Sequence, residues 1–293
     1  MTEPYIARSL EEVQTLLSRP GGRLFAGGTA ADTQTVDYPV SITEVPNLAF
    51  FRDKGNKAEL GPLVTLETIA ASMPLRKKVP ALTAAVLTVG TPELRSRATL
   101  GGNLSQGFIG TLALPLLAAN AQITLKTEED YRELPLERFY NADGRPNLNF
   151  DEVLIKIAFS ACETNEWEGF QRDGLRDAEE DHSTAAALRI KWDAKGRICS
   201  ARCFGAAYNY GYIRLRSVEK LLKGNMLHEL PKLDLSRAKI PETLLPPLRG
   251  VLTQASEFDP CPSEVPSDSL AAPCQTGPKD AEEYDPENDR REF

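Results

Sequence analysis

The hydrophobic positions of this chain change repeatedly between the spacing of helices and the spacing of strands. Leu10, Val13, Leu16 and Leu17 recur at intervals that place them on one helical face. Helical signals of this kind cover 10–18, 66–72, 80–89, 112–121 and 215–222. Short apolar or alternating runs predict strands over 23–26, 40–42, 58–60, 122–126, 153–159, 183–192 and 197–208. We therefore expect an α+β protein.

Local signals mark several of the predicted ends. Ser9 and Glu12 have the spacing of a capping box before the first helix. The segment 193–196, Asp-Ala-Lys-Gly, is typical of a hairpin turn between two strands. Gly224 is well placed as the residue that follows the C-cap of the last predicted helix.

The composition changes sharply near the end of the chain. Residues 256–293 contain 11 acidic, 3 basic and six proline residues, whereas the body has equal numbers of acidic and basic residues. A segment with so few large apolar residues cannot offset the entropy of ordering itself, so we expect a tail that is disordered or covers a partner. We expect a first domain over 1–160, with subdomains that divide near 55, and a smaller α+β domain over 161–255.

Charge and hydropathy exclude two classes of partner. An acidic tail and a neutral body argue against nucleic acid, which binds basic surfaces. No apolar run approaches the roughly 20 residues of a membrane span, and the first residues lack the basic segment of an export signal. We expect a cytoplasmic protein.

Two glycine pairs are the strongest candidates for a binding site. The first lies in 26–29, Ala-Gly-Gly-Thr, after a short apolar run, and the second lies in 99–103, Thr-Leu-Gly-Gly-Asn. Adjacent glycines allow positive φ and close approach of a ligand, so two such loops could bind an anion such as a pyrophosphate through backbone N–H groups. The alternative is two ordinary turns, since Gly-Gly is a common turn dipeptide.

Cysteine and histidine offer little for other chemistry. Cys199 and Cys203 fall on one face of a predicted strand, and with Cys261 and Cys274 they could supply four thiolates to a metal or cluster. The alternative is free cysteines that behave as small hydrophobic residues. With only two histidines, a histidine-built metal site or a Ser-His-Asp triad is hard to assemble.

Read in order, these motifs resemble one family. The most specific run covers 89–103 and reads VGTPELRSRATLGGN, and it is preceded by LFAGGT at 24–29 and LGPLVTL at 60–66. This pattern is similar to that of the FAD-binding (medium) subunits of the molybdenum hydroxylases, such as xanthine dehydrogenase and carbon monoxide dehydrogenase. The resemblance covers roughly residues 4–224 and implies a PCMH-type FAD-binding fold, with the domain over 1–160 as the FAD-binding domain.

The resemblance also implies a cofactor, partners and a set of contacts. FAD would relay electrons from a molybdopterin-binding large subunit and a [2Fe-2S] small subunit to NAD+ or another acceptor. Two sets of residues would enclose the FAD diphosphate, namely Ala26, Gly27, Gly28, Thr29 and Ala30 on one side and Thr99, Gly101, Gly102 and Asn103 on the other. Asp32 would be an approximate stand-in for a family aspartate, and Arg172 could supply positive charge near the flavin ring.

The chain departs from the family after the second glycine pair. Where the family shows Ala-Ser-Pro-x-x-Asp, this sequence places Phe108 and Leu112 at the serine and aspartate positions. Without such a carboxylate, its polar partner would lack a hydrogen bond, which costs about 1–3 kcal/mol. Thr111 could supply the missing hydrogen bond. The alternative is a structural subunit that has lost flavin binding. A stand-alone FAD oxidase of the vanillyl-alcohol type is disfavoured, because no histidine or cysteine that could tether flavin precedes Cys162.

Overall fold

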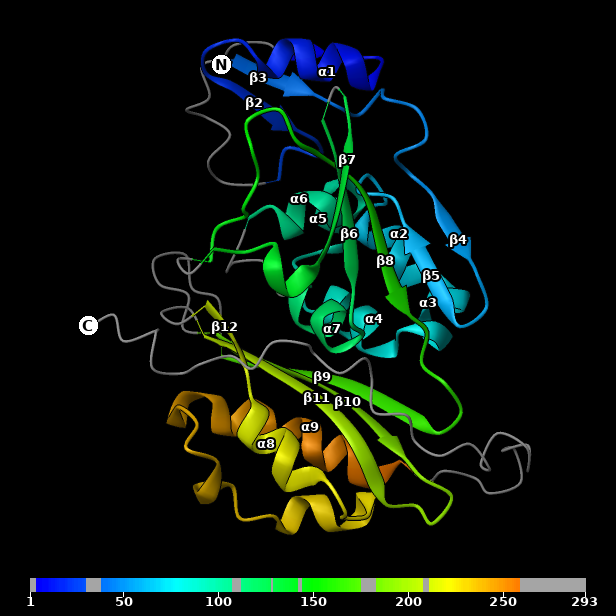
Figure 1. The fold of residues 1–293 in the computed structure, drawn as a ribbon, viewed down its shortest axis with the longest axis vertical. Coiled ribbons are helices and arrows are strands. Elements are labelled where there is room, and N and C mark those ends of the chain that lie inside the picture. The colour runs from blue at the N-terminus through cyan, green and yellow to red at the C-terminus, as the bar shows by residue number, and fades with distance from the viewer. Residues whose placement is uncertain are drawn as a thin grey trace.

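The computed structural model describes residues 4–29, 38–106, 112–127, 129–141, 144–174, 183–207 and 211–258. Three sheets with helices packed on them follow one another along this part of the chain, as expected for an α+β protein (Figure 1). The predicted acidic tail lies almost wholly outside the described residues. The predicted boundaries near 55, 160 and 255 stay a prediction.

The N-terminal sheet is small and parallel. Its strands lie in the order β1 (Tyr5–Ile6), β3 (Tyr38–Ser41) and β2 (Gly22–Phe25), and helix α1 (Leu10–Leu17) packs on them. The predicted cap is confirmed, since the Ser9 hydroxyl accepts a hydrogen bond from the Glu12 N–H at 3.2 Å. Val13, Leu16 and Leu17 of the helix are buried against Val40.

The central unit is an antiparallel sheet with helices on it. Its strands lie in the order β4 (Phe51–Asp53), β5 (Lys57–Leu60), β8 (Val153–Ser160), β6 (Gln122–Lys126) and β7 (Tyr131–Pro135). The helices of this unit are α2 (Leu66–Ala71), α3 (Met73–Lys78), α4 (Pro80–Leu87), α5 (Pro92–Arg97), α6 (Leu100–Leu104) and α7 (Ala113–Ala118), with the 3-10 helix η3 (Leu136–Arg138). Together they enclose the largest hydrophobic core among the described residues.

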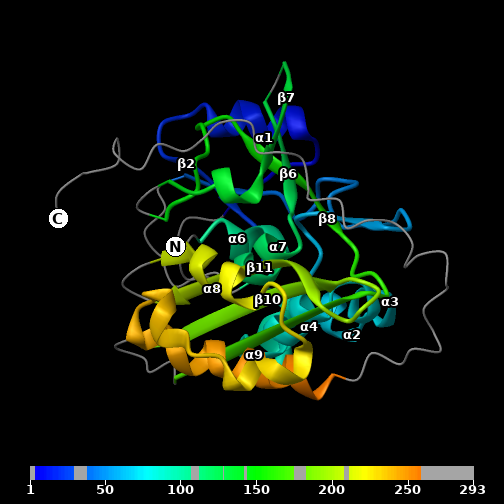
Figure 2. The ribbon, with the colours of Figure 1, turned by 60° about the horizontal axis from the view of Figure 1, so that its bottom comes forward.

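The third sheet is antiparallel and lies between two layers of helices. Its strands lie in the order β12 (Gly211–Arg214), β11 (Ile198–Ala207), β10 (Thr184–Trp192) and β9 (Glu166–Asp173). Helices α4 and α7 contact one side, and α8 (Arg216–Leu222) and α9 (Leu245–Glu257) contact the other (Figures 1 and 2). Three 3-10 helices, η4 (Leu227–Lys232), η5 (Leu235–Ala238) and η6 (Glu242–Leu244), connect α8 to α9. Side chains of the sheet therefore belong to two cores.

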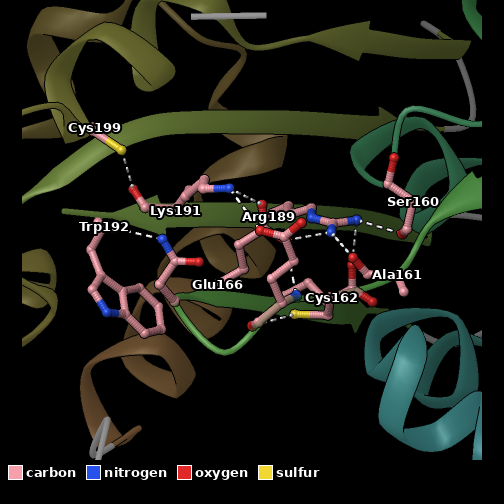
Figure 3. A network of polar contacts seen from close by, with 11 residues as sticks. Ser160, Ala161, Cys162, Glu166, Arg189, Lys191, Trp192 and Cys199 are labelled. Carbon is pink, nitrogen blue, oxygen red and sulfur yellow. Dashed lines mark hydrogen bonds and ion pairs between the residues drawn. The ribbon is translucent and has the colours of Figure 1, made fainter. Parts of the chain in front are cut away.

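A buried ion cluster lies where β8 leads toward β9 (Figure 3). The Arg189 guanidinium donates to the carbonyl of Ser160 at 2.8 Å and to the carbonyl of Ala161 at 2.5 Å. It also donates to Glu166 Oε2 at 2.5 Å and lies 3.6 Å from Glu168 Oε2. Arg189 therefore ties the third sheet to the end of the central one.

Several elements differ from the expectations. The second glycine pair lies inside helix α6 rather than in a loop. Helices α3 and α9 and strands β7 and β9 were not expected, and the helices over 80–89 and 112–121 are shorter than predicted. The hairpin at 193–196 is confirmed, with Gly196 at a φ of +73° and its N–H bonded to the Asp193 carbonyl at 2.9 Å.

Candidate functional site

The first glycine loop follows β2 and offers unpaired backbone donors. Gly28 has a φ of +64°, a conformation that side chains rarely adopt, so glycine is needed there. The N–H groups of Gly27, Gly28 and Thr29 donate to no acceptor among the described residues. The loop from Ala26 to Thr29 is half-buried. Its backbone can therefore bind an anion through N–H groups.

The second glycine pair uses its backbone differently. Thr99 is the N-cap of α6, and its hydroxyl accepts from the Gly102 N–H at 3.1 Å. The Asn103 N–H donates to the Thr99 carbonyl at 3.0 Å, and the Gly101 N–H donates to the Pro62 carbonyl at 2.8 Å. These donors are committed inside the protein, so the idea of two equivalent N–H nests is wrong for the second pair. At the second glycine pair, a ligand would therefore contact side chains and glycine Cα atoms of α6 rather than free N–H groups.

The absence of a side chain at Gly101 allows α6 to approach the turn before α2. A Cβ at this position would lie 2.6 Å from Pro62 Cβ. The Leu100 N–H donates to the Val64 carbonyl at 2.9 Å, beside the isolated bridge between Thr65 and Thr99. Gly101 thus positions α6 instead of donating to a ligand.

The first glycine loop contacts Arg97, the last residue of α5, two residues before the second glycine motif. A Cβ added to Gly27 would lie 1.6 Å from the Arg97 carbonyl oxygen, so the two backbones are in direct contact. A Cβ added to Gly28 would lie 3.0 Å from the Phe25 ring and 3.6 Å from Arg97 Nη2. The Arg97 backbone therefore requires glycine at position 27, whereas the positive φ and the Phe25 ring require it at position 28. The fold brings together two motifs about 70 residues apart in the chain.

The two arginines of this segment have different environments. Arg95 is buried, and its Nε donates to Glu67 Oε2 at 2.9 Å. Arg97 is exposed, and its side chain forms no hydrogen bond or ion pair with another described residue. Sequence reasoning gave Arg97 no role, because the sequence does not show which of Arg95 and Arg97 is paired. The only signal in the sequence was its position two residues before Thr99.

Asn103 of α6 forms a hydrogen bond with Leu112, the residue before α7. Asn103 Oδ1 accepts a hydrogen bond from the Leu112 N–H at 3.4 Å, and the Leu112 side chain is fully buried in the central core. Among the described residues, the buried side-chain atoms without a hydrogen bond belong to Gln14, Thr83, Arg132 and Glu168. None of these residues is in a glycine motif, so no buried side-chain atom in the described part of the motifs lacks a hydrogen bond.

Arg172 lies at the end of β9 against the C-terminal end of α4. Its guanidinium donates to the Thr88 carbonyl at 3.5 Å and to the Ser183 hydroxyl at 2.9 Å. These two hydrogen bonds join Arg172 to Thr88 and Ser183, neither of which belongs to a glycine motif. The other expected contacts at Ala30, Asp32 and Thr111, like Phe108, lie outside the described residues.

The cysteines do not assemble a metal site in the part of the chain that the structure describes. Cys199 falls at the irregularity of β11, where the register with β10 shifts, and Cys203 is fully buried. Burial raises the pKa of the Cys203 thiol, which favours the neutral form over a thiolate ligand. Cys261 and Cys274 lie outside the described residues. No helix among the described residues is long and apolar enough to span a membrane.

Comparison with known sequences places the glycine motifs in a family context. Among curated proteins, the putative xanthine dehydrogenase FAD-binding subunit of Escherichia coli is 27% identical over 157 residues, covering 51% of this chain and 54% of that protein. The match thus spans about half the length of that relative. The nicotinate dehydrogenase FAD-subunit of Eubacterium barkeri is 23% identical over 235 residues, covering 76% of this chain and 79% of the relative.

Solved structures share the fold. Carbon monoxide dehydrogenase from Hydrogenophaga pseudoflava matches with a TM-score of 0.74 at 16% identity, covering 86% of this chain and 96% of that chain. Quinoline 2-oxidoreductase from Pseudomonas putida matches with a TM-score of 0.71 at 19% identity, covering 87% and 97%. The expected PCMH-type fold is confirmed by these neighbours.

A sequence family described as the FAD binding domain in molybdopterin dehydrogenase matches residues 1–159, which include both glycine motifs and Arg97. The match covers more than half of the chain. The chain therefore belongs to the family of FAD-binding domains of the molybdopterin dehydrogenases.

Proposed function

We propose that this chain is the flavin-carrying subunit of a multisubunit molybdenum hydroxylase. A large subunit would hold molybdopterin, and a small subunit would hold [2Fe-2S] clusters. This chain would hold FAD where electrons leave the complex for NAD+ or another acceptor. When bound, FAD supplies reversible two-electron redox chemistry.

The contact of the first glycine loop with Arg97, two residues before the second glycine motif, is the observation that carries this proposal. The unpaired N–H groups of Gly27, Gly28 and Thr29 fit a negatively charged diphosphate, and the positive φ of Gly28 orients that backbone. Relatives whose names contain an FAD-binding subunit or FAD-subunit point to the same ligand. The residues therefore fit FAD.

Contacts on the α6 side would come from the exposed surface of the helix. Gly102 and the side chain of Asn103 are half-buried, so both remain accessible to a ligand. Thr99 and Gly101 would act mainly by positioning α6, as their internal hydrogen bonds indicate. Ala26, Ala30, Asp32, Thr111 and Arg172 complete the proposed set of contacts.

Spectroscopy of the complex tests the proposal. We would purify the chain together with its partner subunits, record the absorption spectrum and quantify flavin released by acid. We expect close to one FAD per chain, together with molybdenum and iron in the same complex. Purification without flavin, and no uptake of added FAD, would overturn the proposal.

A scaffold without flavin is the competing function, suggested by Phe108 and Leu112. Leu112 is buried in the central core, and no buried side-chain atom in the described part of the glycine motifs lacks a hydrogen bond. The double substitution Phe108→Ser and Leu112→Asp distinguishes a scaffold from a flavoprotein. A scaffold would gain flavin binding from the change, whereas the native chain of a flavoprotein already binds FAD.

A further inference from the structure

We propose that Arg97 is the side chain that binds the diphosphate of the dinucleotide against the first glycine loop. This inference rests on the proposed function, and it assigns the counter-charge at the site. Arg97 would be a binding residue, because its guanidinium would contact the cofactor directly.

The first step is geometric. The Arg97 carbonyl oxygen packs against Gly27, so its backbone is fixed relative to the loop. Its Nη2 lies 3.6 Å from the place where a Cβ on Gly28 would stand, which puts the guanidinium beside the loop. Unpaired N–H groups and a guanidinium thus border the same space. Any side chain at Gly28 would narrow that space between Phe25 and Arg97.

The second step concerns charge. Arg95 is held by Glu67 and by the carbonyls of Val89 and Gly90. Glu93 is the one acidic residue of α5. Hydrogen bonds from the Thr91 hydroxyl and from the backbone N–H of Glu93 lower the pKa of the Glu93 carboxyl. Among the described residues, no acidic side chain forms an ion pair with Arg97. A guanidinium bonds phosphate oxygens in a bidentate manner, which a single N–H cannot do.

Titration of the full-length chain with FAD tests the role of Arg97. Quenching of flavin fluorescence would give the Kd for wild type, Arg97→Gln, Arg97→Lys and Arg249→Gln. Arg249 is the matched control, because it is an exposed arginine of α9 without an ion pair among the described residues. Only the backbone of Arg97 packs on Gly27, so neither substitution removes that contact, and thermal unfolding would check the fold.

The expected pattern separates charge from structure. Arg97→Gln should weaken FAD binding by about tenfold or more. Arg97→Lys should weaken it by less, because lysine keeps the positive charge but cannot donate two parallel hydrogen bonds to phosphate oxygens. Arg249→Gln should change the Kd less than twofold. The loss in Arg97→Gln should shrink as ionic strength rises, because salt screens an exposed charge. An unchanged Kd in Arg97→Gln would overturn the assignment and leave the proposed function standing.

Calorimetry with inorganic pyrophosphate distinguishes the two proposals. If wild-type chain binds no FAD, the proposed function fails, and pyrophosphate then tests the anion site alone. Binding to wild type that is lost in Arg97→Gln would support Arg97 as an anion-binding residue. Absence of pyrophosphate binding in a chain that binds no FAD would overturn both proposals.

Discussion

Replacing Glu168 by glutamine should stabilise this protein at alkaline pH. Glu168 lies on β9 opposite Arg189 of β10, and its side chain is fully buried. Its carboxylate faces the backbone N–H of Ala81 and lies 3.6 Å from Arg189, yet neither oxygen completes a hydrogen bond among the described residues. Glu166 and the thiol of Cys162 are the neighbouring acidic groups.

The magnitude follows from the shifted pKa. Burial raises the pKa of Glu168 from 4.5 to about 7, although Arg189 opposes the shift. Below pH 4.5 the Glu168 carboxyl is protonated in both the folded and the unfolded protein. Between pH 4.5 and about 7 it releases its proton only in the unfolded protein. The free energy of unfolding therefore falls as pH rises through this window, by about 3 kcal/mol in total. Glutamine carries no charge and avoids this loss.

Urea unfolding at several pH values measures the effect. Both tryptophans lie on the strands of the cluster, Trp167 on β9 and Trp192 on β10, so intrinsic fluorescence reports the local transition. Relative to wild type, Glu168→Gln should gain about 3 kcal/mol at pH 8 and less than about 1 kcal/mol at pH 5. The comparison between variants removes the contributions of other carboxylates.

Glu166→Gln is the matched control with the opposite sign. Glu166 Oε2 accepts from Arg189 at 2.5 Å and from the Glu163 N–H at 3.1 Å, so its loss should destabilise the protein by about 2 kcal/mol at pH 8. If Glu168→Gln were less stable than wild type at pH 8, the ionised carboxylate would be a net stabiliser. An equal effect at pH 5 and pH 8 would equally refute the reasoning.

Three other measurements follow from the site and the cysteines. Gly27→Ala should lower the free energy of unfolding by at least about 2 kcal/mol and reduce bound flavin, because its Cβ would collide with the Arg97 carbonyl. Thr99→Val should cost about 1 kcal/mol in urea unfolding through loss of the α6 cap, while Thr99→Ser keeps it. Burial raises the pKa of the Cys162 thiol to about 12, so iodoacetamide at pH 8 should alkylate native Cys162 at least tenfold more slowly than in urea, as followed by peptide mass spectrometry.

Each of these expectations has a clear opposite. Wild-type stability and flavin content in Gly27→Ala would show that the loop can move away from α5. Equal stability of the valine and serine variants of Thr99 would show that the hydroxyl contributes nothing to α6. Alkylation of native Cys162 at the rate found in urea would mean that the thiol is accessible and ionised.

Elements marked by local signals were predictable from the sequence. Helix α1 has its own cap at Ser9 and an apolar face, and the hairpin at 193–196 has a glycine where positive φ is needed. The resemblance of the motif run to a family of flavoprotein subunits also led to the correct fold. These features need no knowledge of distant contacts.

Elements stabilised by tertiary contacts were not predictable. Two adjacent glycines disfavour a helix, yet α6 forms because Thr99 caps it and Pro62 and Val64 hold its first N–H groups. Helix α9 has Pro246 and Pro247 directly after its first residue, Leu245, and prolines are tolerated in a first turn although they also mark loops. The distinction between Arg95 and Arg97 depends on Glu67, 28 residues away from Arg95.

The third sheet has a consequence for folding cooperativity. Phe170, Ala187 and Phe204 contribute to the same core as the helices of the central unit, while Leu188 and Ile190 contribute to the core under α8 and α9. A chain cut after Ser160 would leave α4 and α7 without the strands that cover them. Expressed alone, that fragment would expose apolar surface and aggregate. The flavin-binding half and the C-terminal half should therefore melt in one shared transition, because neither can complete its interior without the other.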